Sequence, residues 1–358
     1  MGLLRFILAL SVVAAHSGAI FGSTFVGGQY AVESFYIISG FYMSLILNEK
    51  YINANGSYRL FITNRFMRLF PIYWIVLLLT VITSLLIYYV SKGQNAGAFA
   101  PYITNYPFMN MGSFVFMIFT NIVVFFQDAV MFLGLNTANG HLFFTSNFSQ
   151  TNPQLYTFLF LPQAWTIAIE LTFYLVAPFI VRRKPVIILT LLIISVFIRL
   201  ILYRMGLHND PWTYRFFPTE LAFFLLGTIA YHIYKKIENK EVPPRYIDVL
   251  IILLLLFTFF FNRMHIPGIQ YVYIACIFIT LPFIFKRTKR SKMNTYIGEL
   301  SYPMYISHIF ILGLLTALNI PMPFGGGLTL AICTILFSLL LNELVAKRIE
   351  KLRQRRIA

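Results

Sequence analysis

Residues 182–204 read RRKPVIILTLLIISVFIRLILYR, a long apolar run that follows three basic residues. A helix needs about 20 consecutive apolar residues to cross the hydrocarbon core of a bilayer. A single charge, Arg199, interrupts this run before its end. A basic cluster beside such a run is typical of a cytoplasmic loop. This stretch alone therefore predicts a membrane-spanning helix.

The composition extends this interpretation to the whole chain. The chain has 358 residues, of which 59% are apolar and 11% are charged. Soluble domains carry about 25% charged residues, so lipid is the expected solvent for most of this surface. We predict an all-α, polytopic membrane protein. Its candidate spans lie near residues 3–20, 30–48, 69–91, 164–181, 186–204, 216–234, 247–262, 270–285, 300–318 and 327–346.

The distribution of the 28 Lys and Arg residues predicts the topology. Most of them fall on one side if the N-terminus is cytoplasmic and the eleventh apolar run, 114–135, does not cross. A single crossing by 114–135 would place the basic cluster 182–184 outside, against the positive-inside rule. We therefore predict about ten transmembrane helices with both termini in the cytoplasm. The same asymmetry accounts for the net charge of +16, so membrane lipids, and no nucleic acid, are expected partners.

This topology divides the chain into a membrane domain over 1–346 and a basic cytoplasmic tail over 347–358. Residues 92–163 form an extended outer-face segment, in which the run 114–135 is expected to dip into the membrane or to lie over the bundle. The apolar run near the N-terminus is interpreted as the first membrane helix rather than as a cleaved signal peptide. The two cysteines lie in apolar runs, and no Cys/His spacing indicates a metal site.

Ionisable side chains inside membrane helices are costly and therefore indicate function. His16 and Glu170 are both expected in the outer half of the membrane, counted from the ends of their helices. A neutral imidazole can take a proton from an alcohol near pH 7, and a neighbouring carboxylate can fix its tautomer. We therefore predict His16 as a general base oriented by Glu170. Hydrogen bonding between packed helices is the alternative role for both residues.

Arg65 and Arg68 precede the third apolar run at i, i+3 spacing, which places both guanidinium groups on one helix face. Planar guanidinium groups suit phosphate or carboxylate ligands. The pair therefore predicts an anion site at the cytoplasmic side. Ordinary anchoring by positive charges is the alternative.

Several segments, taken together and in order, resemble membrane acyltransferase family 3, the bacterial polysaccharide O-acyltransferases. The resemblance runs over nearly the whole chain, and each motif is weak alone. It rests on Arg5 and His16 with ten residues between them, on 33–41 (ESFYIISGF), on 64–74 (NRFMRLFPIYW), on 164–174 (AWTIAIELTFY) and on 300–308 (LSYPMYISH). The departures are small: Glu33 stands where many members carry Asp, and Ile167 stands where Leu is usual.

The resemblance implies a transmembrane O-acyltransferase of the stand-alone class, in the bacterial cytoplasmic (inner) membrane. Such an enzyme moves an acyl group, usually acetyl, from a cytoplasmic acyl-CoA to a hydroxyl of an extracytoplasmic or lipid-linked glycan. Acetyl-CoA is then a co-substrate, and no permanently bound cofactor or metal is expected. The motif positions imply donor-binding roles for Arg5, Arg65, Arg68, Ser39, Tyr302, Tyr305 and His308. Packing hydrogen bonds between helices are an equal alternative for Ser39, Tyr302, Tyr305 and His308. Glu33, Trp165 and Glu220 are expected on the acceptor side.

Two mechanisms are compatible with these residues. The acceptor hydroxyl can attack the thioester directly, with His16 as base, or His16 can first carry the acetyl group itself. Two other classes of function are also compatible with polar residues in a membrane bundle. A glycan or lipid transporter or flippase would show repeats and broken helices in corresponding halves, and the sequence has no visible repeat. A non-catalytic envelope scaffold is the third alternative.

Overall fold

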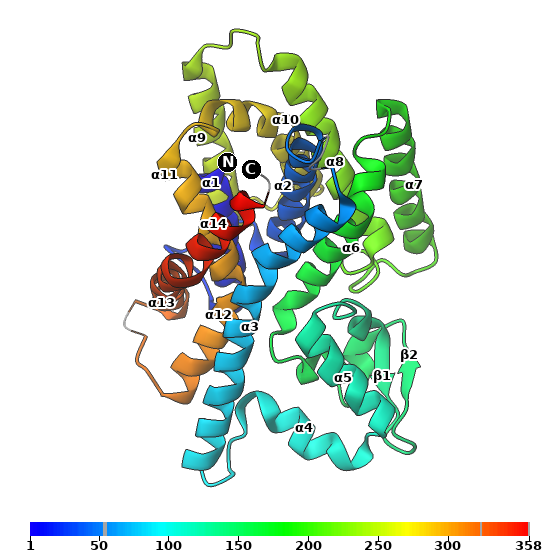
Figure 1. The fold of residues 1–358 in the computed structure, drawn as a ribbon. Helices are drawn as coiled ribbons and strands as arrows, with labels where there is room; N and C mark the ends of the chain where they lie inside the picture. Colours follow the sequence, from blue (N-terminus) through cyan, green and yellow to red (C-terminus); the bar gives the residue numbers. More distant parts are fainter. Residues whose placement is uncertain (53–55, 323, 357–358) are drawn as a thin grey trace.

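The computed structural model describes residues 1–52, 56–322 and 324–356, which form one helical bundle (Figure 1). Each of the ten expected spans is a helix, which confirms the predicted all-α class. Their bounds are α1 (Gly2–Ser17), α2 (Gly27–Glu49), α3 (Tyr58–Val90), α6 (Trp165–Ile180), α7 (Pro185–Arg204), α8 (Phe217–Ile237), α9 (Pro244–Phe260), α10 (Ile269–Thr288), α12 (Ser301–Ala317) and α13 (Gly326–Leu341).

Eight helices among the described residues are long and apolar enough to cross a membrane. The two remaining expected spans are α1 and α8. α1 has only 16 residues, and α8 carries Glu220 and ends in two lysines. Both are well buried, so their shorter or more polar sequence is shielded from lipid by neighbouring helices. Peripheral helices such as α7 instead expose Val186, Ile193 and Phe197.

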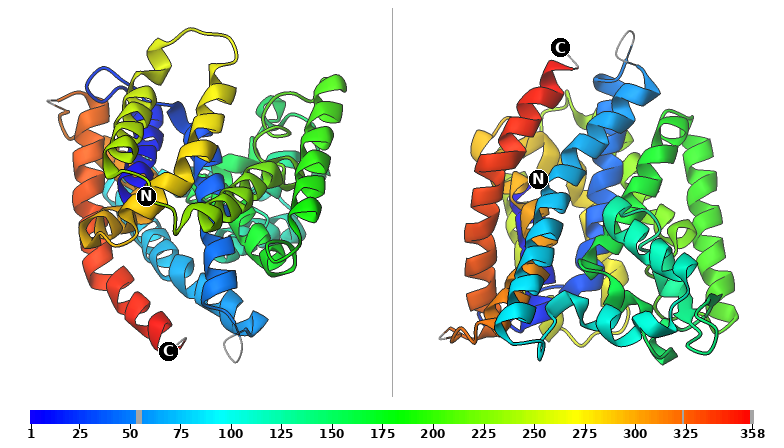
Figure 2. Two further views of the ribbon diagram at one scale, coloured as in Figure 1. Left: turned by 90° about the horizontal axis from the view of Figure 1, so that it is seen from above. Right: turned by 60° about the horizontal axis from the view of Figure 1, so that its bottom comes forward.

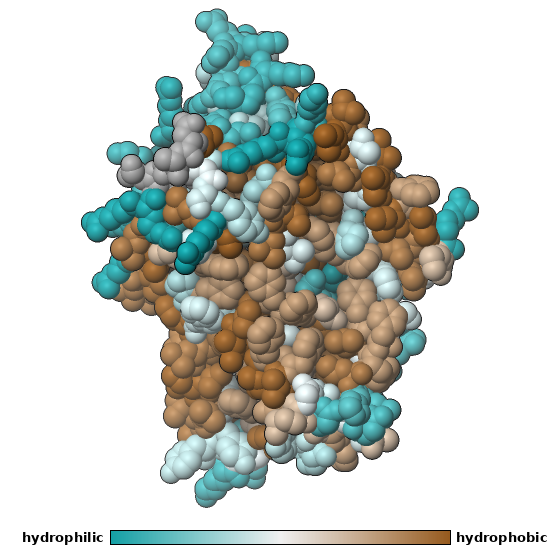
Figure 3. All heavy atoms as spheres, turned by 45° about the vertical axis from the view of Figure 1, so that its right-hand side comes forward, coloured by the Kyte–Doolittle hydropathy of each residue, from teal (hydrophilic) through white to brown (hydrophobic). Residues whose placement is uncertain are grey.

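The surface shows the expected polarity for a membrane bundle. On the face shown in Figure 3, an apolar band lies between two hydrophilic ends. One end, which we call the basic face, gathers the ends of α2 and α8 and the start of α3. Arg182 bonds there to the carbonyl of Leu47, and Lys289 to Glu238. The Met1 amine bonds to Asn294 there, and Arg356 bonds to Asn64, so the first and the last described residues lie on this face.

Residues 92–163 form a compact structure at the opposite end of the bundle (Figure 1). It contains α4 (Ala100–Asn105), α5 (Met111–Val123) and an antiparallel hairpin of β1 (Leu133–Leu135) and β2 (Leu142–Phe144), in which Gly134 faces Phe143. α5 has 13 residues, or about 20 Å at 1.5 Å per residue, which is too short to span the hydrocarbon core. The chain turns at Val124, which has a φ of +69°, so 114–135 is not one continuous helix. Its position relative to the membrane stays a prediction.

Short elements complete the fold. α11 (Lys292–Glu299) precedes α12, and a π-helical turn (Asn342–Ala346) joins α13 to α14 (Lys347–Arg355). Short 3₁₀ helices occupy Gly97–Phe99, Tyr106–Phe108, Ala129–Phe132, Phe148–Gln150, Leu155–Phe158, Pro162–Ala164 and Phe261–Arg263.

The helices pack most closely where α2 meets α8. Gly40 of α2 lies against the backbone of Phe224, and Gly227 of α8 lies against the backbone of Ile37. Small residues allow such close approach between membrane helices. α1 lies inside the bundle and packs against α2, α11, α12 and α13 (Figure 2). The central position of α1 decides where Arg5 and His16 lie.

Candidate active site

An internal cavity lies between five helices, α1, α2, α3, α6 and α12. Its volume is about 100 Å³, and we call it the inner cavity. The polar side chains that line it include Arg5, Ser39, Arg68, Glu170 and Tyr302. All five were predicted as site residues, and the fold brings them together from helices that are far apart in the sequence.

Glu170 is the anionic centre of the inner cavity. Its carboxylate accepts hydrogen bonds from the Ser39 hydroxyl at 2.7 Å and from the Tyr174 hydroxyl at 2.5 Å. The positive charges of Arg5 and Arg68 also act on it. Charge-assisted hydrogen bonds of this kind hold side chains firmly in a low-dielectric interior. Glu170 therefore holds the Ser39 and Tyr174 hydroxyls by hydrogen bonds, and its charge lies near those of Arg5 and Arg68 in the same cavity wall.

A second, larger cavity adjoins the inner cavity and lies at the basic face. We call it the vestibule; its volume is about 620 Å³. Arg5, Tyr42, Arg68 and Tyr302 line both cavities. Arg65 lines the vestibule and is 4% exposed. The predicted arginine pair therefore lies on a passage from the basic face toward the middle of the bundle.

His16 lies in the last turn of α1, eleven positions after Arg5. Eleven residues make about three turns, so both side chains lie on the same face of α1, about 17 Å apart along its axis. The Nδ1 atom of His16 is 2.9 Å from the carbonyl oxygen of Val12. Because a carbonyl only accepts, Nδ1 must donate, and in the neutral ring the lone pair is then on Nε2. This is the protonation state that a general base requires.

The His16 ring lies beside the ring of His308, another predicted site residue. The two ring centroids are 4.9 Å apart. His308 is fully buried, its Nδ1 donates to the carbonyl of Tyr305 at 2.7 Å, and its Nε2 has no hydrogen-bond partner. α12 therefore contributes a second neutral imidazole beside the first.

The structure does not bring Glu170 to His16. Glu170 bonds to Ser39 and Tyr174, while the Nδ1 atom of His16 bonds to backbone. The depth estimate placed both residues in the outer half because it counted from the start of each apolar run. In the folded chain Glu170 instead shares the inner cavity with Arg68, which also lines the vestibule at the basic face. The carbonyl of Val12, not a carboxylate, fixes the tautomer of His16.

Tyr302 and Tyr305 of α12 use their hydroxyl groups to join helices. Tyr302 donates to the carbonyl of Leu69 at 2.7 Å, and Tyr305 donates to the carbonyl of Gln163 at 3.0 Å. Thr166 donates to the Tyr305 hydroxyl at 2.7 Å. Both tyrosines also line the inner cavity. They therefore combine an architectural bond with a place on the cavity wall.

The predicted acceptor-side residues form two groups. Glu220 is fully buried and pairs with Arg199 at 2.7 Å, and the Arg199 charge also acts on the buried Glu33. Glu33 accepts a hydrogen bond from Gln29 at 3.0 Å. Arg199 therefore pairs with one oxygen of Glu220, while the other Glu220 oxygen has no hydrogen-bond partner among the described residues.

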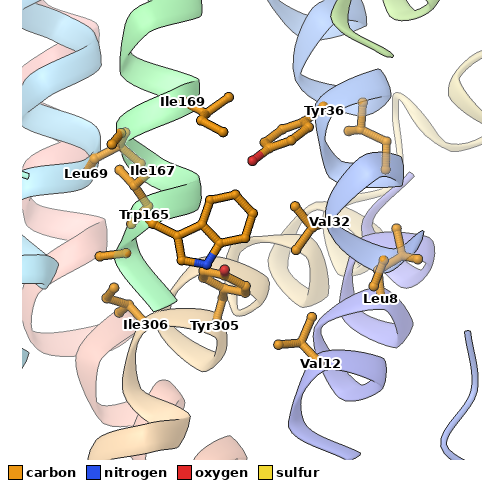
Figure 4. Packing of buried hydrophobic residues seen from close by; sticks show 14 of the residues in the cluster. Leu8, Val12, Val32, Tyr36, Leu69, Trp165, Ile167, Ile169, Tyr305 and Ile306 are labelled. Carbon is orange, nitrogen blue, oxygen red and sulfur yellow. The ribbon is translucent and has the colours of Figure 1, made fainter. Parts of the chain in front are cut away.

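Trp165 belongs to the second group, an aromatic cluster at the start of α6. Its ring packs on Tyr214, and the guanidinium of Arg215 lies 4.2 Å from its centroid. Figure 4 shows Trp165 and Tyr36 extending toward each other between α6 and α2, with Tyr305 beside the indole. Tyr36 and Tyr305 line the inner cavity, so the aromatic cluster at Trp165 adjoins this cavity.

Sequence reasoning did not single out three residues that the structure adds to the site. Tyr174 follows Glu170 by one helical turn, and this spacing was visible in the sequence. Tyr42 and Arg353 line the vestibule, but their proximity depends on contacts between distant segments. Within the described ranges, no group of His, Cys, Asp or Glu side chains is arranged to hold a metal ion.

Comparison with known proteins supports the resemblance seen in the sequence. A family model described as an acyltransferase domain matches residues 1–343. A protein of Aquifex aeolicus (strain VF5), described as uncharacterized, is 23% identical over 54% of this chain and 89% of its own length. No solved structure matches the chain.

Proposed function

Because the chain belongs to membrane acyltransferase family 3, we propose that this multi-pass membrane acyltransferase is an O-acetyltransferase. It takes the acetyl group from cytoplasmic acetyl-CoA and delivers it to a hydroxyl of an extracytoplasmic or lipid-linked glycan. The observation that carries the proposal is the passage from the vestibule to the inner cavity. The passage begins among arginines at the basic face and reaches Arg5 of α1; His16, which lines neither cavity, lies three turns further on along the same face of this helix.

The donor enters from the basic face in this proposal. The phosphates of acetyl-CoA lie in the vestibule near Arg65 and Arg68, because guanidinium groups suit phosphate oxygens. The pantetheine arm extends past Arg5 and Tyr302 into the inner cavity. Glu170 is a positioning residue here, since it holds the Ser39 hydroxyl and places a negative charge in the cavity wall that Arg5 and Arg68 share.

His16 is the proposed general base. The acceptor oxygen bonds to the thioester carbonyl carbon while its proton passes to Nε2 of His16. The carbon–sulfur bond then breaks, and the departing thiolate takes the proton from His16. His308, whose ring lies beside His16, keeps the imidazole in place. Transfer through an acetyl-His16 intermediate is the rival route, and an acetylated enzyme trapped without acceptor would establish it.

The acceptor approaches from the end opposite the basic face. Trp165 and its aromatic neighbours suit a sugar ring, since flat aromatic faces pack on apolar C–H surfaces. Glu220 pairs with Arg199 and Glu33 bonds to Gln29, so we assign both carboxylates to the structure of the acceptor side rather than to direct chemistry. With this orientation the bacterial inner membrane is the proposed location.

The first prediction tests transfer directly. Membranes that contain wild-type protein should incorporate labelled acetyl from acetyl-CoA into envelope glycans, and His16→Ala should reduce the rate by about 10²- to 10⁴-fold, the usual contribution of a general base. His265→Ala removes an exposed imidazole from the loop before α10 and is the matched control. Mass spectra of surface glycans with and without the protein would identify the acyl group and the acceptor.

Three outcomes would contradict the proposal. Full incorporation by His16→Ala would exclude His16 as the base. Movement of an unmodified glycan across the membrane without acetyl incorporation would favour the transporter. Binding of both substrates without transfer would favour the scaffold.

A further inference from the structure

The C-terminal helix α14 lies across the start of α3 at the basic face (Figures 1 and 2). Arg356 donates to the side-chain oxygens of Asn64 and Thr63, both at 2.9 Å. Asn64 also donates to the Tyr51 hydroxyl at 3.0 Å, which connects this contact to the end of α2. The π-helical turn before α14 directs the helix toward these partners. α14 therefore forms one wall of the vestibule and is not simply a basic tail on the membrane surface.

The wall formed by α14 and the opposite wall formed by α3 each contain an arginine. Each of these arginines has a buried N–H group without a hydrogen-bond acceptor. Arg353 of α14 is 6% exposed; it bonds to Glu350, but its Nε–H has no acceptor. Arg65 of α3 is 4% exposed, and its Nε–H also has no acceptor. Both side chains line the vestibule. A buried charged donor without an acceptor is unfavourable, so each points to an anionic ligand.

The charge of the vestibule also indicates an anionic ligand. Among the described residues, its walls carry eight basic side chains and two acidic ones, Glu299 and Glu350. The charges of Arg65 and Arg68 act on Arg353, so the three guanidinium groups repel one another. Buried like charges are retained in proteins when an oppositely charged group compensates them. The excess of positive charge therefore calls for a ligand with several negative charges.

We propose that Arg353 and Arg65 form a two-sided binding site for phosphate groups, with α14 as one side and α3 as the other. This inference rests on the proposed function and deepens it, because the nucleotide part of the donor carries such phosphates. The headgroup of an anionic lipid of the cytoplasmic leaflet presents the same chemistry at the same face. Arg353 binds phosphate oxygens through its free Nε–H edge in either case.

The experiment measures binding, not transfer, with the full-length protein in lipid nanodiscs. Calorimetric titration with CoA and with pantetheine, which lacks the phosphates, gives a dissociation constant for each. Arg353→Gln should raise that of CoA about 10-fold or more, since a hydrogen bond to a charged group contributes about 1.5–3 kcal/mol. The affinity for pantetheine should not change. Arg353→Lys keeps the charge and loses the planar guanidinium group. Its dissociation constant for CoA should therefore lie between those of the wild type and Arg353→Gln.

Arg355→Gln is the matched control. It removes the same charge two residues away on α14, but Arg355 is exposed and does not line the vestibule. Thermal unfolding and elution volume of each variant exclude a folding defect. If Arg353→Gln does not fold, the comparison of Arg353→Lys with Arg355→Lys replaces it. The donor site would be overturned if Arg355→Gln lowered the CoA affinity as much as Arg353→Gln. It would also be overturned if Arg353→Gln lowered the affinities for pantetheine and for CoA equally.

The two phosphate sources are separated by a second measurement. Native mass spectrometry after exchange into phosphatidylcholine or phosphatidylglycerol nanodiscs reports retained anionic lipid. Loss of retained phosphatidylglycerol in Arg353→Gln, with unchanged CoA affinity, would assign the site to lipid. No effect on either ligand would overturn the inference, while wild-type acetyl transfer would still support the proposed function. Failure of the wild type to bind CoA would instead contradict the proposed function.

Discussion

At the scale of single residues, Glu170 shows how a charge inside the helical bundle is held. Two hydroxyl groups donate to its carboxylate, and the charges of Arg5 and Arg68 act on it. Among the described residues that line the inner cavity, Glu170 is the only acidic side chain beside Arg5 and Arg68. This carboxylate therefore offsets part of the positive charge of the proposed donor channel.

Neutralising this carboxylate should impair transfer. Glu170→Gln should lower kcat/KM for the acyl donor by about 10- to 100-fold, because removing one partner of a buried charge network is costly. Ser39→Ala and Tyr174→Phe each remove one hydrogen bond, worth about 1 kcal/mol, and should lower kcat/KM about fivefold. Steady-state kinetics with varied donor concentration checks this order. Wild-type kinetics in Glu170→Gln would remove Glu170 from the donor channel.

Sequence patterns identified most site residues but not all of their neighbours. The i, i+3 spacing of Arg65 and Arg68 predicted a shared face, and both line the vestibule. The partner of Glu170 was misjudged because depth along a helix does not report which other helices surround it. Arg353 lay in a stretch that resembled an ordinary basic tail, and its burial depends on long-range docking of α14.

At the scale of elements, the contact between α2 and α8 depends on two glycines. A Cβ on Gly227 would lie 1.9 Å from the carbonyl oxygen of Ile37, and one on Gly40 would lie 1.9 Å from that of Phe224. Backbone cannot move away as a flexible side chain can. α2 supplies Ser39 and Tyr42 to the cavities, so its distance from α8 also sets the position of site residues.

Gly227→Ala should therefore separate these helices and destabilise the protein. We expect a loss of about 1–3 kcal/mol in the free energy of unfolding, the usual cost of overpacking. Gly313→Ala in α12 is the control, because a Cβ there would meet no atom within 4 Å. Unfolding in detergent, followed by circular dichroism, compares the two. Equal stability of both variants would show that the α2–α8 contact tolerates a wider spacing.

The ten apolar runs predicted the helices well, because burial in lipid requires long apolar segments with satisfied backbone groups. The outer-face segment was harder to predict. β1 and β2 have three residues each and pair through contacts that only the folded segment creates. The end of α5 at Val123 also had no clear signal, since the sequence stays apolar beyond it.

At the scale of the whole molecule, the predicted orientation depends on residues 114–135 not crossing the membrane. Asn139 lies before α6 in the chain and Arg183 lies after it, and both are exposed. The side of the membrane on which each residue lies shows whether 114–135 crosses. A single crossing by 114–135 would exchange the sides on which these two positions lie. The orientation of the complete bundle can therefore be tested with two cysteines.

An impermeant maleimide should label Asn139→Cys in intact cells, and Arg183→Cys only after the cells are opened. Cys276 and Cys333 are replaced by Ala in both variants, because they are the only other thiols of the chain. Gel-shift detection of the labelled fraction provides the measurement. The reverse pattern would show that 114–135 crosses, and would place the basic cluster 182–184 outside.

The short central helix α1 carries Arg5 and His16 on the same face, three helical turns apart. One inserted residue between them would advance His16 by about 1.5 Å and rotate it by about 100° around the axis. The imidazole would then leave His308 and point into a neighbouring helix. Loops of this protein can lengthen over evolutionary time without altering that alignment. The number of residues between Arg5 and His16 fixes the angle between their side chains around the helix axis. Natural variation in this interval should therefore proceed by substitution and not by insertion or deletion.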